Sequence, residues 1–263
     1  MPLDSLYPVS RDQVGFYQRN GYVRLPAVLT PDEVRDLRKI LSHAVKDRLK
    51  RVERGEITYD PRYEKVFVQM VNLWEEYPDI NPFVHSLRLA EIARRLSRSR
   101  SVRLWHDHAL IKPPKDGAET PWHQDFPYWP MNEPGALSCW LALDDVSEKN
   151  GCLSFVPETH KLGPLKPISL TRSKSIFKQA GLNKRTVKPA VMTLKAGGCT
   201  FHHGNLFHYA GPNLSSRSRR AIAIIYMPSG TTFNGASHIV TDGLGLKVGA
   251  RFSGPKFPVL ARR

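Results

Sequence analysis

The sequence predicts a mainly β protein in which a helical N-terminal part, residues 1–100, supports an all-β barrel or sandwich formed by residues 101–263. Two observations predict this arrangement. Apolar residues recur at helical spacing before residue 100, and short strand-like runs separated by turn residues follow it. A length of 263 residues suits one large domain or two small ones. The chain shows no internal repeat, and we expect a single domain over residues 1–263.

Two helices are predicted in the N-terminal part. The first starts at Thr30, a typical N-cap residue, with Pro31 at the first helical position and Glu33 three residues after the cap. Its apolar residues recur at helical spacing: Val34, Leu37, Ile40, Leu41 and Val45. The second covers residues 81–97, with four residues expected on its inner face: Phe83, Leu87, Ile92 and Leu96.

Beyond residue 100 the sequence favours strands. The runs SVRLWHDHALIK, LSCWLALDDV, CLSFVPETH, AVMTLKAGGCTFHH and RRAIAIIYMP are each bounded by Gly, Pro or Asn. Between two of them lies a basic, polar segment, residues 161–188, which we expect to be a long loop. Loops of this length are often lids over a functional site or are disordered.

Composition limits the possible classes. With 41% hydrophobic residues the chain can bury a substantial core, and no apolar stretch reaches the roughly 18 residues of a membrane span. Three widely spaced cysteines argue against a disulfide framework or a zinc ribbon, and, with no secretory signal visible, they favour a reduced, cytoplasmic compartment. The net charge of +15 indicates weak attraction to anions, but no nucleic-acid-binding motif accompanies it. A solvated basic surface is the simpler interpretation.

The stretch TPWHQDFPYWP, residues 120–130, contains the first candidate metal ligands. On a strand, His123 and Asp125 would point to the same face. They could bind a metal together or form a structural hydrogen-bonded pair. Two histidines and one carboxylate form the ligand set of many non-heme Fe(II) sites, and a third ligand could come from His202, His203 or His208.

Several segments together resemble the phytanoyl-CoA dioxygenase family of Fe(II)- and 2-oxoglutarate-dependent oxygenases. They are GYVRLPAVLTPDEVRDLR, HDHALIKPP, TPWHQDFPYWP, WLALDDVSEKNGCLSFVPETHKLG, FHHGNLFHYAGPN followed by SRRAIAIIYMP, and FPVLARR. The resemblance spans the chain from about residue 14 to its last residue. It implies a double-stranded β-helix (a jelly-roll, cupin-like core) behind the helical N-terminal part.

The resemblance also assigns roles. His123, Asp125 and His208 match the iron ligands, and Arg219 matches the arginine that binds the far carboxylate of 2-oxoglutarate. Trp140 and His108 match positions that contact this cosubstrate, although plain core packing would also explain them. His202 matches a histidine that does not bind metal, and His203 has no assigned role. Ala210 departs from the pattern, because some members have a serine there that helps to hold the cosubstrate.

The implied reaction consumes dioxygen and 2-oxoglutarate, releases succinate and carbon dioxide, and hydroxylates or otherwise oxidises an unactivated C–H bond of a small molecule. Halogenating relatives lack the carboxylate that is present here as Asp125, so hydroxylation is favoured. We expect the substrate, for which an anionic group is one option, to contact four residues: Gln69, Phe126, Tyr128 and Trp129, with Met131 close by. Packing of the barrel mouth explains the aromatic residues equally well.

Two alternatives to small-molecule oxidation come from the same residues. Nucleic-acid demethylases of this chemistry carry a second arginine six residues after the first, and that position is Ile225 here. A non-catalytic metal-binding jelly roll would need an incomplete ligand set or a missing cosubstrate arginine, and neither is found. The ligand set could also hold Mn, Co or Ni in place of iron. We expect no nucleic-acid partner, and the oligomeric state remains open.

Overall fold

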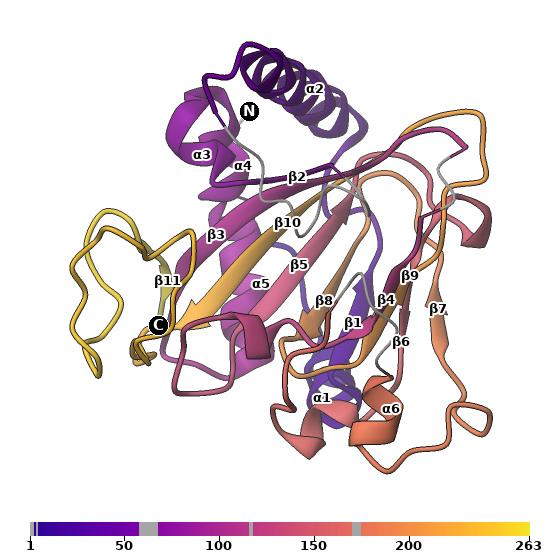
Figure 1. The fold of residues 1–263 in the computed structure, drawn as a ribbon, viewed down its shortest axis with the longest axis vertical. Helices are drawn as coiled ribbons and strands as arrows, with labels where there is room; N and C mark the ends of the chain where they lie inside the picture. The colour runs from indigo at the N-terminus through magenta and orange to yellow at the C-terminus, as the bar shows by residue number, and fades with distance from the viewer. Residues whose placement is uncertain (1–2, 4, 58–67, 116–117, 170–174) are drawn as a thin grey trace.

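Two antiparallel sheets form the core of the computed structural model, which describes residues 3, 5–57, 68–115, 118–169 and 175–263 (Figure 1). The large sheet has the order β1-β8-β5-β10-β3-β11, with β2 also paired to β3, and the small sheet has the order β4-β9-β6-β7. The strands are β1 (Tyr22–Leu25), β2 (Val68–Val71), β3 (Ser101–Lys112), β4 (Thr120–His123), β5 (Leu137–Ala142), β6 (Leu153–Phe155), β7 (Ala190–Met192), β8 (Cys199–His203), β9 (His208–Ala210), β10 (Arg219–Pro228) and β11 (Val259–Arg262).

The strand order identifies the architecture as the predicted double-stranded β-helix. From β3 to β6 and again from β7 to β10, consecutive strands alternate between the two sheets. The chain therefore winds through both layers twice, as in a jelly roll. The sequence prediction of a mainly β fold with flanking helices is confirmed.

The helices are α1 (Arg11–Asn20), α2 (Pro31–Glu53), α3 (Leu73–Glu76), α4 (Asn81–Val84), α5 (Leu87–Ser97) and α6 (Ile176–Gln179). Helix α2 begins as predicted: the Thr30 hydroxyl accepts a hydrogen bond from the Glu33 N–H, and the Glu33 carboxylate accepts one from the Thr30 N–H. Its apolar stripe is buried at Val34, Leu37 and Leu41. None of the helices in the described part of the chain is both long and apolar enough to cross a membrane.

One helix prediction was wrong. Residues 81–97 form two helices, α4 and α5, because the chain turns at His85 and Ser86 caps the new helix by accepting a hydrogen bond from the Leu89 N–H. The break rotates the second helix, so Leu87 is 42% exposed and Leu89 is fully buried in its place. Phe83, at the other end, is buried as predicted.

The N-terminal part is less purely helical than predicted, because β1 and β2 join the large sheet. β1 pairs with β8, placing Tyr22 opposite His202, and β2 pairs with β3, placing Val71 opposite His108. Four-residue strands carry too little periodicity to be recognised in a sequence.

The large sheet separates two cores. Side chains of β10 alternate between them: Ile222 and Ile224 join the core under α2 and α5, whereas Ala223 and Ile225 join the core on the opposite, inner face. The helices thus cover the outer face of the sheet, and Figure 1 shows α5 crossing behind it. Cys139, Cys152 and Cys199 are free, in agreement with the prediction of no disulfide framework, and all three are buried.

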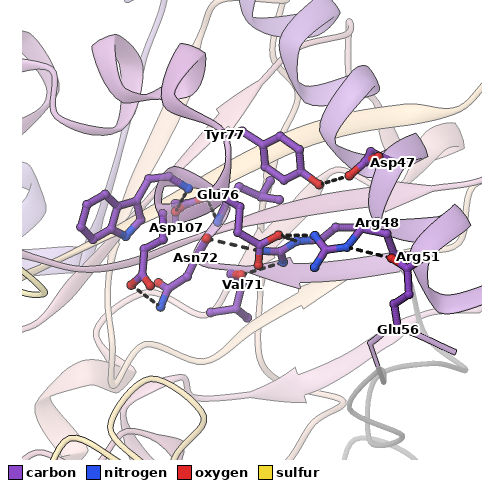
Figure 2. Close-up of polar contacts among 12 residues, drawn as sticks. Asp47, Arg48, Arg51, Glu56, Val71, Asn72, Glu76, Tyr77 and Asp107 are labelled. Carbon is purple, nitrogen blue, oxygen red and sulfur yellow. Dashed lines mark hydrogen bonds and ion pairs between the residues drawn. The ribbon is translucent and has the colours of Figure 1, made fainter.

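A buried polar network fastens β2 and α3 to the rest of the fold (Figure 2). Arg48 of α2 donates hydrogen bonds to the carbonyl oxygens of Val71 and Asn72 at 2.8 and 3.3 Å, and pairs with Glu76 at 3.0 Å. The carboxylate of Asp107, which is fully buried, accepts hydrogen bonds from the N–H groups of Leu73 and Trp74 at the start of α3. These bonds satisfy helix N–H groups that have no partner within the helix.

Burial raises the pKa of Asp107 to about 7, against the opposing effects of the Trp74 and Leu73 N–H groups and the Arg48 charge. Between about pH 4 and 7 the folded protein therefore keeps a proton on Asp107 that the unfolded chain has released. The contribution of Asp107 to the free energy of unfolding thus falls as pH rises through this range.

Replacing Asp107 by Asn should remove this pH dependence. The free energy of unfolding of Asp107→Asn should rise relative to wild type as pH increases from 4 to 7, by up to about 1.4 kcal/mol per pH unit. Urea unfolding at several pH values measures the difference, with Asp36→Asn, an exposed change on α2, as control. A difference between Asp107→Asn and wild type that stays constant with pH would contradict the burial argument.

Candidate metal centre and cosubstrate site

The structure brings His123, Asp125 and His208 together. One ligand atom from each lies within 4.8 Å of the others. His123 ends β4 and His208 starts β9, and the two are direct register partners on the small sheet. The Oδ1 atom of Asp125 lies 3.5 Å from the Nε2 of His123 and 3.4 Å from the Nε2 of His208. Three such donors around one point suit a divalent transition metal.

Backbone carbonyl groups fix which ring nitrogen of each histidine faces this point. The Nδ1 of His123 lies 2.7 Å from the carbonyl oxygen of Pro121, and the Nδ1 of His208 lies 3.1 Å from that of Leu206. A carbonyl oxygen only accepts, so each Nδ1 carries a proton, and each Nε2, which faces the Oδ1 atom of Asp125, is the nitrogen that a metal would bind. Burial, together with the nearby His208, lowers the pKa of His123, so the ring is kept neutral and able to bind a metal.

The second carboxylate oxygen of Asp125 is held from the large sheet. The Ser138 hydroxyl donates to Oδ2 at 3.0 Å, and the Nε2 of His202 lies 3.4 Å from the same atom. Ser138 and His202 are register partners on β5 and β8. Burial alone would raise the pKa of Asp125, but His208, His123 and His202 outweigh it and hold the pKa well below its usual range. The carboxylate is therefore ionised.

The sequence analysis did not find these supporting roles. Ser138 belongs to an ordinary strand pattern, and its contact with Asp125 arises only when the two sheets meet. His202 was predicted not to bind metal, and its place beside the Asp125 carboxylate was missed. His203 turns away: its Nδ1 accepts a hydrogen bond from the Asn205 N–H.

Gln124, between the two predicted ligands, anchors the turn that carries them. It is 2% exposed and donates to the carbonyl oxygens of Gly163 and Asn205, at 2.9 and 2.7 Å, while accepting from the Leu165 N–H. The turn is also tied by the N–H groups of Asp125 and Phe126, which both donate to the Gly204 carbonyl at 2.9 Å. His123 and Asp125 are thus positioned by bonds on both sides.

Arg219 starts β10 on the inner face and is a buried cation without an acid partner among the residues that the structure describes. It is 3% exposed; its Nη1 donates to the Leu110 carbonyl at 3.0 Å, and its Nε has no hydrogen-bond partner in that part of the chain. The guanidinium lies 5.2 Å from the ring of Trp140. Burial lowers its pKa to about 10, against the attraction of Asp144 and Cys152, so it remains charged at neutral pH. An unpaired buried guanidinium is costly unless a ligand supplies an anion.

The neighbouring Arg220 shows the contrast. Its side chain makes a bidentate pair with Asp144 at 2.9 and 2.8 Å. The opposite orientation of Arg219 and Arg220 agrees with the sequence analysis, which placed the two on different faces of the strand.

A row of residues across the large sheet lies between Arg219 and the metal centre. Thr200, Trp140, Ala223 and His108 occupy matching positions on β8, β5, β10 and β3. The Thr200 hydroxyl is fully buried and has no hydrogen-bond partner within the described ranges of the chain. Burial lowers the pKa of His108 to about 4, with Asp125 opposing and His202 adding to the shift, so this ring is neutral. The predicted residues Trp140 and His108 thus share one face with Arg219.

The predicted substrate residues divide into three groups. Phe126 and Trp129 are buried core residues at 6% and 8% exposure, whose rings meet edge to face beside Gly204. The hydroxyl of the half-buried Tyr128 donates to the Ile168 carbonyl in the long segment 161–188. Gln69 lies on β2 opposite Leu110, and its side chain falls outside the described part of the structure. Met131 is buried, and its backbone forms an isolated antiparallel β-bridge with Phe233.

The segment 161–188 is mostly loop, as predicted, apart from α6 and the 3-10 turn that ends at Leu162. Ile168, Ile176 and Phe177 form a small apolar cluster with Val156 and Phe207, against which Trp122 packs. Residues 170–174 lie outside the described structure, and the described residues of the segment lie beside the β4 turn, through the contacts of Gln124 with Gly163 and Leu165 and of Tyr128 with Ile168.

The two-layer β fold and its donor set place the protein among the non-heme Fe(II)- and 2-oxoglutarate-dependent dioxygenases. The particular family follows from the sequence comparison: the phytanoyl-CoA dioxygenase (PhyH) family model matches residues 17–221, and the chain belongs to this family.

Named relatives support the assignment. Ectoine dioxygenase of Bordetella bronchiseptica is 28% identical over 253 residues, covering 86% of this chain and 78% of that protein. Peroxisomal phytanoyl-CoA dioxygenase of Rattus norvegicus is 26% identical, covering 83% and 68%. Among solved structures, the non-heme α-ketoglutarate-dependent carbocyclase SnoK from nogalamycin biosynthesis superposes with a TM-score of 0.81 at 26% identity, covering 96% of this chain and 97% of that one.

The contact of Ser138 with Asp125 should matter for metal binding. Ser138→Ala removes one of the two groups that orient the second oxygen, and Fe(II) affinity should fall by roughly 10- to 100-fold. Anaerobic competition against a chelator measures the affinity, and Ser154→Ala on β6 serves as the matched control. Equal affinities for Ser138→Ala and wild type would contradict the role.

The contrast between Arg219 and Arg220 gives a second prediction. Arg219→Gln should weaken 2-oxoglutarate binding by roughly 100-fold or more, because two charge-assisted hydrogen bonds to a buried carboxylate are lost. Arg220→Gln removes the same charge from the other face and should leave the affinity within a factor of about three. Calorimetric titration compares the two, and similar losses in both variants would place the cosubstrate elsewhere.

Proposed function

We propose that this protein oxidises a C–H bond of a small-molecule metabolite or natural product, with His123, Asp125 and His208 as iron ligands and Arg219 as the anchor of 2-oxoglutarate. The observation that supports this most strongly is the pairing of a complete donor set with a buried, unpaired guanidinium on the same side of the large sheet. A structural ion pair would have satisfied Arg219 internally, as Asp144 satisfies Arg220.

The residues fit both groups that the class uses. The two Nε2 lone pairs and the ionised Asp125 oxygen offer three donors to Fe(II), while Arg219 and the partnerless Thr200 hydroxyl offer hydrogen bonds to a carboxylate. Thr200 would supply the hydroxyl that is missing at Ala210. When bound, iron with 2-oxoglutarate and dioxygen supplies the oxidising power that removes hydrogen from an unactivated C–H bond.

The protein itself orients the side chains that would bind the metal and excludes water from the site. The Pro121 and Leu206 carbonyl groups keep both histidines in one tautomer, and Ser138 keeps the carboxylate aligned. The inner core, with Trp105, Trp140 and Ile225 buried beside the site, limits access of water to the reacting centre.

A compact organic substrate is favoured by the relatives. SnoK and the epimerase SnoN, the latter with a TM-score of 0.76 at 26% identity, both come from nogalamycin biosynthesis, and ectoine dioxygenase is named for a small metabolite. Carbocyclisation is an oxidation other than hydroxylation, and epimerisation inverts a stereocentre without changing the oxidation state of the product, so hydroxylation is one of several outcomes that this class of reaction allows. The lysines and arginines of the segment 161–188 suit a substrate with an anionic group.

Nucleic-acid demethylation receives no support from the site. Ile225, at the position of the second arginine of such enzymes, is 1% exposed in the inner core. A purely structural role is disfavoured because a non-catalytic protein would gain nothing from an unpaired cation at Arg219.

Succinate formation tests the proposal. With Fe(II), 2-oxoglutarate and dioxygen, a panel of polycyclic and amino-acid-derived natural products should contain compounds that stimulate succinate release. Asp125→Ala should lower the stimulated rate by at least about 100-fold, because a metal ligand is lost. Asp145→Ala, at a surface ion pair with Lys195, is the matched control. Stimulation by methylated oligonucleotides alone, or full activity of Asp125→Ala, would refute the proposal.

A further inference from the structure

A cleft of about 460 Å³ opens on the outer side of the protein, away from the metal centre. Its charged lining consists of six arginines, with no carboxylate side chain among the lining residues: Arg11, Arg94, Arg95, Arg98, Arg100 and Arg263. They come from the start of α1, the end of α5 and the turn after it, and the residue that follows β11. We propose that this arginine cleft is a binding site for a small anion with two or more phosphate groups.

The cleft is separate from the proposed catalytic centre. The buried residues of α5, including Leu89, Ile92 and Leu96, belong to the core on the outer face of the large sheet, whereas Trp140 and Ile225 belong to the inner core. The cleft lies at the end of the sheet where β3 begins, next to Ser101, and Arg219 pairs with Lys112 at the other end of β3. A ligand in the cleft cannot reach the iron ligands, so it is not the oxidised substrate.

Five of the six guanidinium groups are available. Arg94 is neutralised by a bidentate pair with Glu91 at 2.7 Å, and it also donates to the Ser99 carbonyl. The side chains of the other five donate no hydrogen bond and make no ion pair within the described structure. Arg98, Arg100 and Arg11 are exposed, so their positions are not explained by packing.

Helix electrostatics explains only part of the cluster. Arg94 and Arg95 lie in the last turn of α5, where cations interact favourably with the helix dipole. Arg11 is the first residue of α1, where a cation is unfavourable, yet its side chain lines the same cleft. Arg98 adopts a left-handed conformation with φ of 54°, at a helix end where glycine is usual. A bound anion would offset both costs and the mutual repulsion of the arginines.

The chemistry of the side chains points to phosphate. The planar guanidinium fork matches phosphate oxygens in bidentate geometry, which lysine cannot do. Two such forks largely occupy the oxygens of one phosphate, so five available groups indicate a ligand with at least two phosphates. The volume is that of a small-molecule site. A protein or nucleic-acid partner would be expected to use a broader, flatter surface.

The test is calorimetric titration of the full-length chain with inorganic pyrophosphate in 150 mM NaCl, with orthophosphate as a second ligand. We expect one saturable site, with pyrophosphate binding at least tenfold more tightly than orthophosphate. Arg98→Gln/Arg100→Gln should weaken pyrophosphate binding by at least tenfold. Arg217→Gln removes an exposed arginine just before β10, at the opposite end of the sheet, and should leave binding unchanged. Saturating 2-oxoglutarate should have no effect.

Three outcomes would overturn the proposal. No saturable binding of pyrophosphate at 1 mM would exclude a polyphosphate site, including the case in which only an acidic protein or a nucleic acid binds. Equal weakening by Arg217→Gln would show diffuse attraction to the +15 surface. Hydrogen exchange gives a measurement that needs no variant: pyrophosphate should protect amides within residues 94–100, and protection confined to other segments would place the site elsewhere.

Discussion

The metal centre depends on one constraint: the turn after β4 must be bonded to both sheets at once. The small sheet supplies His123 and His208 as register partners, and the large sheet holds Asp125 through Ser138 and His202. The three donors come from the small sheet and the turn after β4, and the contacts that orient the Asp125 carboxylate come from the large sheet. Formation of the three-donor site is therefore coupled to closure of the jelly roll, and the site is as rigid as the packing of its two layers.

The same closure creates an electrostatic division of the inner face. At one end an ionised carboxylate lies among histidine rings, and at the other a buried arginine has no acid partner among the described residues. Such unbalanced burial of charge lowers the stability of the unliganded protein. This cost is explained if a dianionic cosubstrate binds the metal at one end and Arg219 at the other, because the buried charges are then neutralised. The charges of the site are therefore compensated only when the ligand is bound.

Sequence reasoning could find the parts of this arrangement that are local. Capping residues located the start of α2, turn residues bounded the strand-like runs, and the resemblance to the dioxygenase family assigned roles to His123, Asp125, His208 and Arg219. It could not find contacts created by sheet pairing, so Ser138, Thr200 and Gln124 were missed. It also joined α4 and α5, because a capping serine inside an apolar pattern looks like a helix interior. The arginine cleft contributed only to the net charge of +15 in the sequence analysis, since Arg11 and Arg263 are 252 positions apart in the sequence.

The most direct test of the central claim is anaerobic titration of the metal-free protein, first with Fe(II) and then with 2-oxoglutarate, while the visible charge-transfer absorption of the iron–keto-acid chelate is recorded. The account predicts a band that saturates at one equivalent of each and is absent in Asp125→Ala. Confirmed Fe(II) binding without any band on addition of 2-oxoglutarate would contradict it, because the metal and Arg219 would then not serve a common ligand.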